Sequence, residues 1–138
     1  MTDQATTTVR RFFASQDERR GGPEPELVTE GYIAQLSAYP SMDLAAHHQF
    51  SSMFYAAFPD LKHGIEEVVG LGDRVAVRFR ITGTNTESFM GMPASGKPIE
   101  INAIALMTVL DGKVAKVFGA FDELSMMQQI GAIPAQVG

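Results

Sequence analysis

Residues 113–124 have the sequence KVAKVFGAFDEL, in which an apolar run leads to one carboxylate, Asp122, and a helical pattern begins directly after it. Strand alternation places Phe118, Ala120 and Asp122 on one face. If that face lines a cavity, loss of hydration raises the pKa of the Asp122 carboxyl, which suits it to proton transfer near neutral pH. The alternative is an ordinary helix N-cap, because aspartate is a preferred cap residue. This pattern by itself favours the N-cap.

The segments before this stretch have the pattern of an antiparallel sheet. Strands are predicted over residues 62–69, 74–86 and 98–110. In the second of them, Val75 and Val77 alternate with Ala76 and Arg78, as in a strand with one buried face. Asp111-Gly112 is a strong signal for a tight hairpin turn, which returns the chain into the stretch described first.

The N-terminal part of the chain has helical patterns. Helices are predicted over residues 3–20, briefly from residue 24, and up to residue 58 with Ser41 as the N-cap and Asp43 in the first turn. Residues 31–36 are predicted to be extended. Helices followed by long strands predict an α+β fold: a cone-shaped, curved antiparallel or mixed sheet, about three N-terminal helices covering a pocket, and a short C-terminal helix. We expect residues 1–138 to form one such domain.

Composition excludes several classes of function. The net charge is −5, and the sequence has no basic stripe that could neutralise the phosphates of a nucleic acid. The absence of cysteine excludes disulfides, thiolate metal ligands and a cysteine nucleophile, and it agrees with a reducing cytoplasm. No signal-peptide pattern is found at Met1, and no apolar run approaches the length of a membrane span. We therefore expect a cytoplasmic protein that binds neither nucleic acid nor membrane.

Several fragments, in order along the chain, resemble one known family. They are FYAAFPDL at 54–61, GDRVAVRF at 72–79, TGT at 82–84, FMGMPASGK at 89–97, DGKV at 111–114, FDEL at 121–124 and QQIG at 128–131. Together they resemble the SnoaL-like polyketide cyclases of the nuclear transport factor 2 superfamily, from the first helix to Gly131. The resemblance implies a pocket enzyme that needs no metal or organic cofactor and closes a polyketide ring by intramolecular aldol condensation.

The resemblance also implies site residues. The general acid/base of such cyclases is an aspartate at the end of the last strand, and Asp122 occupies that position. Many relatives carry histidines where this chain has Gln35 and Asn85, so Asp122 acts alone or with neutral partners such as these two or Asn102. The substrate-binding residues expected in full are Gln35, Asn85, Arg78, Asn102, Phe50, Phe54, Met53, Met90 and Phe118.

Other candidates are weaker. Arg78 either orients a substrate carbonyl or forms ion pairs on the outer face of the sheet, and its neighbour on the same face, Arg80, favours the second. His47 and His48 are adjacent on a helix and point about 100° apart, which argues against a shared metal site. One of them could still reach the pocket. His63, at a strand start, is expected to be exposed.

Two classes of function follow. The first is a cofactor-independent enzyme that transfers protons next to a carbonyl of a polyketide-like or terpenoid-like molecule, in aldol cyclisation or a related isomerisation, dehydration or hydrolysis. The second is non-catalytic binding of an apolar small molecule, or a dimerisation module; a hydroxylase of the same family is a further enzymatic alternative. A homodimer is expected because the sheet has more apolar residues than its inner face can use: Val75, Val77, Ile99, Ile101, Ala105 and Met107.

Overall fold

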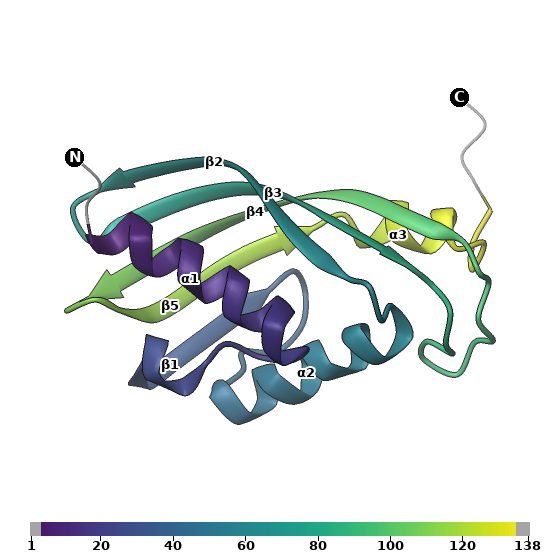
Figure 1. The fold of residues 1–138 in the computed structure, drawn as a ribbon, viewed down its shortest axis with the longest axis horizontal. Coiled ribbons are helices and arrows are strands. Elements are labelled where there is room, and N and C mark those ends of the chain that lie inside the picture. The colour runs from purple at the N-terminus through teal and green to yellow at the C-terminus, as the bar shows by residue number, and fades with distance from the viewer. Residues whose placement is uncertain (1–3, 135–138) are drawn as a thin grey trace.

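The computed structural model describes residues 4–134 and confirms the α+β class (Figure 1). Its elements are α1 (Gln4–Arg19), the 3-10 turn η1 (Pro25–Leu27), β1 (Val28–Leu36), α2 (Leu44–Ala57), β2 (Lys62–Leu71), β3 (Arg74–Thr84), β4 (Pro98–Leu110), β5 (Lys113–Phe121) and α3 (Glu123–Gln129). The second predicted helix is thus only a 3-10 turn. A strand begins directly after it, three residues earlier than expected.

The five strands form one curved, unclosed mixed sheet in the order β1-β5-β4-β3-β2. β2 to β5 pair antiparallel, as the sequence pattern indicated, whereas β1 pairs parallel to β5. The predicted hairpin turn joins β4 to β5: Asp111 and Gly112 both have positive φ, 50° and 76°. Two successive positive φ angles give the turn the twist that adjacent strands require.

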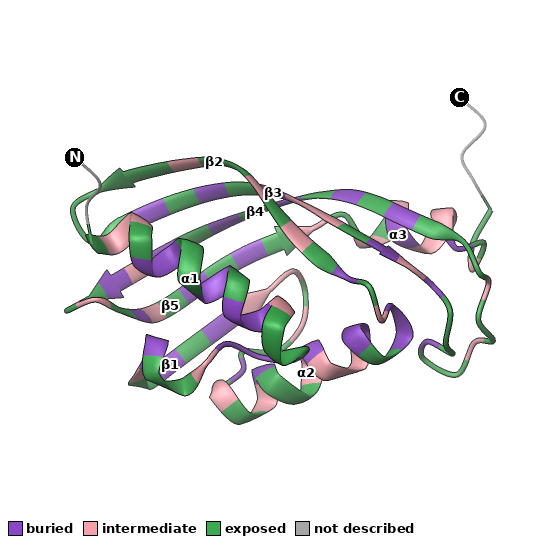
Figure 2. Ribbon diagram, viewed as in Figure 1, coloured by how far each residue is buried: buried purple, intermediate pink, exposed green. Residues whose placement is uncertain are grey.

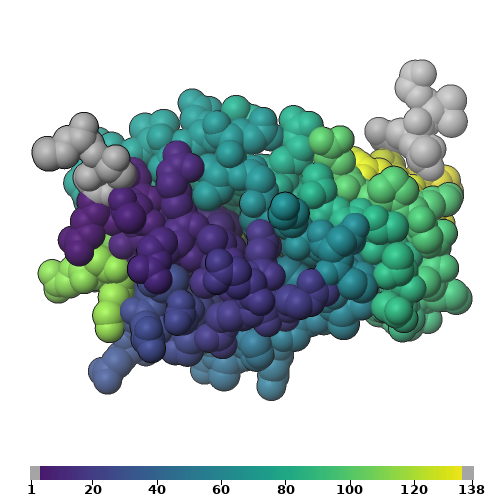
Figure 3. Space-filling model, viewed as in Figure 1, coloured from purple at the N-terminus to yellow at the C-terminus, as the bar shows by residue number. Residues whose placement is uncertain are grey.

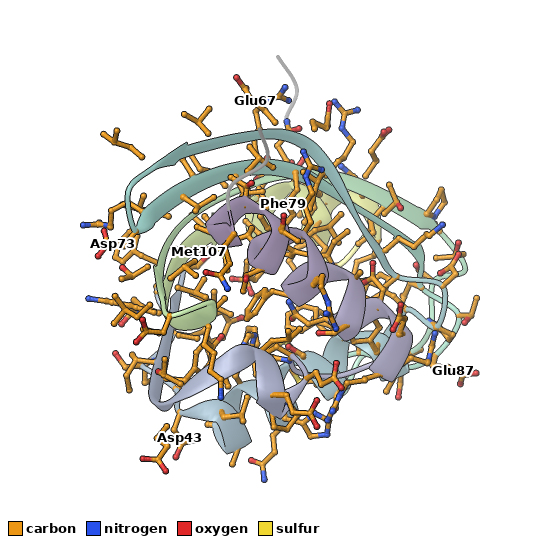
Figure 4. All side chains as sticks on the ribbon, turned by 60° about the vertical axis from the view of Figure 1, so that its left-hand side comes forward. Asp43, Glu67, Asp73, Phe79, Glu87 and Met107 are labelled. Carbon is orange, nitrogen blue, oxygen red and sulfur yellow. The ribbon has the colours of Figure 1, made fainter. Side chains whose placement is uncertain are left out.

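Helix α1 lies across the concave face of the sheet, and α2 packs beside β1 (Figures 1 and 2). Val9, Phe12 and Phe13 of α1 are buried in the main core cluster together with apolar side chains of β3, β4 and β5. In Figure 4, Phe79 and Met107 point from the sheet into this interior, whereas Glu67 points away from it. Figure 3 shows α1, α2 and β2 packed closely together on one side of the molecule.

Helix α2 begins two residues later than the sequence predicted. Asp43, not Ser41, is the N-cap, and its side-chain oxygen accepts a hydrogen bond from the backbone N–H of Ala46 at 2.9 Å. Ser41 instead donates from its hydroxyl to Gln35, 2.8 Å away. Both residues are good cap formers, so the sequence pattern could not choose between them.

A β-bulge in β5 decides which face of this strand points inward. Val109 pairs with Val114 and Thr108 pairs with Lys116, so Ala115 is an extra residue without a partner of its own. Val114 and Val117 are consequently both buried, although they are three residues apart. An odd spacing reverses the alternation, and Phe118 and Ala120 lie on the outer face. Of the three residues on this face, Ala120 contributes to the cavity lining, whereas Phe118 and Asp122 do not.

The outer face of the sheet carries charged and apolar side chains. Arg78 pairs there with Glu66 and Glu67, and Arg80 pairs with Glu66 and Glu100, which agrees with the outer-face interpretation of Arg78. The six residues from which a homodimer was inferred are all buried inside the domain: Val75, Val77, Ile99, Ile101, Ala105 and Met107. That part of the inference is wrong, because one concave face accommodates all six. The exposed apolar residues of the sheet instead include Ile104 and Leu106 of β4 and Phe118 of β5.

Candidate active site

A cavity lies between the concave face of the sheet and helices α1 and α2. Its volume is about 100 Å³. Most of its wall is aromatic or aliphatic, including Phe54, Phe79 and Ile101, and no Asp, Glu, Lys or Arg among the described residues lines it. Five of the lining side chains are polar: Gln16, His47, Ser51, Tyr55 and His63. Such a wall suits a neutral, largely apolar ligand.

A carboxylate directly behind the wall organises part of this polar group. Asp17 Oδ1 accepts hydrogen bonds from His63 Nδ1 at 2.7 Å and from the Tyr55 hydroxyl at 2.6 Å. Its second oxygen, Oδ2, accepts from the backbone N–H of His63 at 2.9 Å. The three residues Asp17, Tyr55 and His63 come from α1, α2 and β2, so the network joins both helices to the edge of the sheet.

These hydrogen bonds keep Asp17 ionised. Burial alone would raise the pKa of its carboxyl, but the side-chain hydrogen bond and positive charge of His63, with the donors from the His63 backbone and Tyr55, lower the pKa below its ordinary value. Burial and the neighbouring Asp17 carboxylate raise the pKa of the Tyr55 phenol, so Tyr55 stays protonated and donates. The aspartate is therefore an anion that accepts from three donors.

An ionised carboxylate also fixes the tautomer of neutral His63. A carboxylate can only accept, so the ring proton of neutral His63 lies on Nδ1 and the lone pair lies on Nε2. Nε2 has no hydrogen-bond partner among residues 4–134, and no enclosed side-chain nitrogen or oxygen in that range lacks one. Because His63 lines the cavity, Nε2 is accessible to a molecule bound there.

His47 presents a second imidazole to the same cavity. Its Nδ1 lies 2.8 Å from the Tyr32 hydroxyl, and the two rings are stacked with an interplanar angle of 12°. Burial, together with the charges of His63 and His48, lowers the pKa of His47 to about 4, so the ring is neutral near pH 7. Within the described chain the Tyr32 hydroxyl has no other partner, and donation to Nδ1 satisfies its hydrogen. With Tyr32 as the donor, the ring proton of neutral His47 lies on Nε2.

Gln16 and Ser51 complete the polar part of the wall. Both side chains are buried and line the cavity, at 4% and 8% exposure. Neither the Gln16 amide nor the Ser51 hydroxyl has a hydrogen-bond partner in the described part of the chain, so both are free to bind a ligand. Ser51 lies one helical turn from both His47 and Tyr55, which places the three on one face of α2.

Two of the residues expected to bind substrate lie on the cavity wall, Phe50 and Phe54. Asp122, the expected acid/base, is exposed instead. It is the N-cap of α3, and its Oδ1 accepts from the backbone N–H of Ser125 at 3.1 Å. Phe121, the residue before it, does line the cavity. The bulge in β5 explains this difference, since it reverses the facing of the residues that follow.

The other expected contacts lie away from the wall. Asn85 is buried, but its amide binds the carbonyls of Ala57 and Glu87 and accepts from the Ser95 N–H, so it holds the loop after β3. The Gln35 amide is engaged by Tyr39 and Ser41 in the turn after β1. The remaining members of the list are exposed or only packed against the core: Arg78, Asn102, Met53, Met90 and Phe118.

The Asp17–His63 pair was missed by the sequence analysis, although a signal was present. In β2, His63 and Ile65 both point partly inward, in the alternation of a half-buried strand. Asp17 follows the buried Phe13 by four residues on α1 and therefore shares its face. The expectation that His63 is exposed is wrong, because its side chain is 12% exposed and packs between Phe13 and Phe79.

Among residues 4–134, no three His, Asp or Glu side chains are grouped as metal ligands. In the same range, no helix is long and apolar enough to cross a membrane.

Comparison with known proteins agrees with this fold. The profile of a family described as SnoaL-like polyketide cyclase matches residues 5–130. A solved structure of a candidate SnoaL-like polyketide cyclase from Jannaschia sp. CCS1 is 27% identical, with a TM-score of 0.80 over 95% of this chain and 94% of that one. No curated protein matches the chain.

Two further structures show the same fold at lower identity. IdmH, a candidate polyketide cyclase from Streptomyces antibioticus, has a TM-score of 0.81 at 24% identity, covering 94% of this chain and 99% of that one. AclR, a candidate hydroxylase from Streptomyces galilaeus, has a TM-score of 0.84 at 17% identity, covering 97% and 85%. The fold is thus shared by proteins named for different reactions.

Proposed function

Because the chain belongs to the SnoaL-like polyketide cyclase family, we propose that it binds a neutral, polyketide-like molecule in its cavity and transfers a proton next to one of its carbonyl groups. The observation that carries this proposal is the combination, inside one cavity, of an apolar wall with three polar groups that have no hydrogen-bond partner in the described part of the chain: Nε2 of His63, the Gln16 amide and the Ser51 hydroxyl. The wall can hold a folded carbon chain and exclude water from it. The polar groups can bind carbonyl oxygens and move protons.

The reaction that fits is an intramolecular aldol cyclisation or a related isomerisation or dehydration. A base removes a proton from the carbon beside one carbonyl, and the resulting enolate attacks a second carbonyl of the same molecule. One carbon–carbon bond forms, and the new alkoxide takes up a proton. No oxidant or reductant is consumed, and the cavity contributes mainly by holding the two carbonyls in a reactive geometry.

Proton exchange in D2O tests this function. A slowly enolising neutral ketone such as 2-acetonaphthone is incubated with the protein, and loss of its α-proton signal is followed by NMR. We expect saturable exchange that is lost in Phe50→Trp, because the larger ring fills a half-buried part of the cavity wall. A ketone that occupies the cavity but exchanges no faster than in buffer would support non-catalytic binding.

Asp122 is retained as a second candidate for the acid/base, from its position at the end of β5. Its exposure and its cap bond to Ser125 weaken this assignment. Asp122→Asn keeps an oxygen that can cap α3 while removing the carboxylate. Exchange at the wild-type rate in this variant would exclude Asp122, and loss of exchange in a folded variant would establish it.

The hydroxylase alternative predicts a different product. AclR is named as a hydroxylase, but at 17% identity the likeness concerns the fold. Mass spectrometry of an aromatic polyketide incubated with the protein and air separates the two reactions. Cyclisation leaves the mass of the substrate unchanged or lowers it by one water molecule, whereas hydroxylation raises it by one oxygen atom.

A homodimer through the outer face of the sheet forms part of the proposal. Ile104 and Phe118 are each 60% exposed and lie on the neighbouring strands β4 and β5, with Leu106 beside them. Apolar side chains grouped on an open sheet are commonly covered by a second copy. Light scattering at micromolar concentration should give twice the chain mass, and Phe118→Glu should give a monomer. A wild-type monomer would refute this part.

A further inference from the structure

We propose that two histidines have complementary roles in the reaction. His63 Nε2 removes the proton from carbon, and the Nε2–H of His47 donates a hydrogen bond to the carbonyl oxygen. This inference rests on the proposed function, because it assigns roles within the same cavity. It adds His63 and His47 as catalytic residues and Asp17 as a positioning residue. The sequence analysis assigned no catalytic role to any of these three residues.

Hydrogen bonds and ring packing fix the position of the His63 imidazole as expected for a general base. Its Nδ1 is 2.7 Å from Asp17 Oδ1 and its backbone N–H is 2.9 Å from Asp17 Oδ2, so one carboxylate binds the residue at two points. The ring is packed between Phe13 and Phe79, with centroid distances of 5.5 Å and 5.7 Å. Nε2, which has no partner in the described chain, is the free basic nitrogen. A carboxylate behind the ring stabilises the imidazolium that forms when Nε2 takes a proton.

Tyr55 holds the carboxylate. Its hydroxyl donates to the same Oδ1 at 2.6 Å, which leaves Asp17 with donors from three directions and one fixed orientation. Arg20 lies over the Tyr55 ring, 5.8 Å from its centroid, so a cation also lies near the network. The charged and titratable groups around His63 are thus Asp17 of α1, Arg20 in the turn after it, and Tyr55 and His47 of α2.

His47 has the opposite arrangement. The Tyr32 hydroxyl donates to Nδ1, which leaves the ring proton on Nε2 and makes that atom a donor toward the cavity. The ring is neutral near pH 7, because burial lowers its pKa to about 4. A neutral imidazole can donate to a carbonyl oxygen and stabilise the enolate that develops there. One histidine is therefore an acceptor and the other a donor.

The reaction balances with these two groups alone. The α C–H bond breaks, its proton moves to His63 Nε2, and the electron pair forms an enolate whose oxygen is bound by His47. The enolate carbon attacks the second carbonyl carbon and forms the ring bond. His63 returns its proton to the new alkoxide and becomes neutral again. Gln16 and Ser51 have free polar groups that can bind the second carbonyl before the bond forms.

The site also defines a substrate class. The described residues that line the cavity contain no Lys or Arg that could pair with a carboxylate or phosphate. A negative group in this wall would be desolvated and would lie near Asp17. We therefore infer a neutral di- or polycarbonyl compound, such as an ester or ketone, and not a free acid.

Ketone exchange in variants tests the assignment. His63→Gln should lower the exchange rate by about 100-fold or more while leaving ketone binding within a few fold. His47→Leu should lower the rate by about 100-fold, and His47→Gln, which keeps an N–H donor, should recover part of it. Glu30→Gln, at an exposed position of β1 that does not line the cavity, serves as the control. Folded His63→Gln that binds ketone and exchanges it at the wild-type rate would overturn the proposal.

Nitrogen-15 NMR gives a second readout that needs no turnover. The three histidines are assigned by single substitution, and we expect the ring proton on Nδ1 in His63 and on Nε2 in His47. Asp17→Asn should redistribute the His63 tautomers as well as slow exchange, which a purely structural role would not require. A proton on Nε2 of neutral His63 would refute the assignment even if the wild type is active. Correct tautomers with no exchange by the wild type would instead refute the proposed function.

Discussion

Removal of one hydroxyl, in Tyr55→Phe, should measurably lower the stability of the domain. The lost hydrogen bond is 2.6 Å long, lies within a buried network and is accepted by an ionised carboxylate. Hydrogen bonds to charged groups contribute about 1.5–3 kcal/mol. The phenylalanine ring fills the same volume apart from the oxygen, so no cavity cost is added. We therefore expect the free energy of unfolding to fall by about 1.5–3 kcal/mol, which for a chain of this size lowers the melting temperature by roughly 5–12 °C.

Urea unfolding followed by circular dichroism measures this loss. The matched control is Tyr39→Phe, whose hydroxyl donates to Glu123 at a half-buried site, and which should cost less. A double-mutant cycle with Asp17→Asn isolates the pair, and we expect a coupling energy of at least about 1 kcal/mol. A loss below about 0.5 kcal/mol in Tyr55→Phe, with an unchanged denaturant slope, would refute the reasoning.

Three further predictions concern stability. Because the pKa of His47 is lowered from 6.5 to about 4 on folding, its stabilising contribution is present above pH 6.5 and is lost as the pH falls toward 4. In His47→Leu, the urea midpoint should therefore change less with pH across this window than it does in the wild type. An equal pH dependence in both proteins would contradict the lowered pKa. Asn85→Ala should cost about 2–4 kcal/mol in the same assay, because it leaves the Glu87 carbonyl and the Ser95 N–H without a partner and removes one of the two donors to the Ala57 carbonyl. A cost under about 1 kcal/mol would mean that water replaces the amide. Gly112→Ala should destabilise the turn by about 1–2 kcal/mol, since φ is 76° and the new Cβ would lie 2.7 Å from Gln4 Nε2; Gly64→Ala, with space for a Cβ, is its control.

The sequence was informative about the fold because the signals there are local or periodic. Alternating Val75 and Val77 and the Asp111-Gly112 turn predicted the antiparallel part of the sheet. The helical spacing of Val9, Phe12, Phe13 and Gln16 predicted α1. The parallel pairing of β1 with β5 could not be predicted, since it joins residues more than 80 positions apart. Local patterns contain no information about which distant strands become neighbours.

The site was harder to predict, for two physical reasons. The bulge at Ala115 shifts the facing of β5 by one residue, so simple alternation placed Phe118 and Asp122 on the wrong side. The Asp17–His63–Tyr55 network brings together side chains from three elements, and each looks ordinary in its own segment. Phe50 and Phe54 do line the cavity, because helical spacing is sufficient to show which face of α2 points inward; their contact with substrate stays a prediction.

The most direct test of the central claim is the exchange of α-protons in a neutral aryl ketone that saturates the cavity in D2O. The account predicts exchange that saturates with ketone concentration, disappears when Phe50→Trp fills the cavity, and falls by about 100-fold in His63→Gln. A wild-type protein that binds the ketone in the cavity yet exchanges its protons no faster than buffer would contradict it.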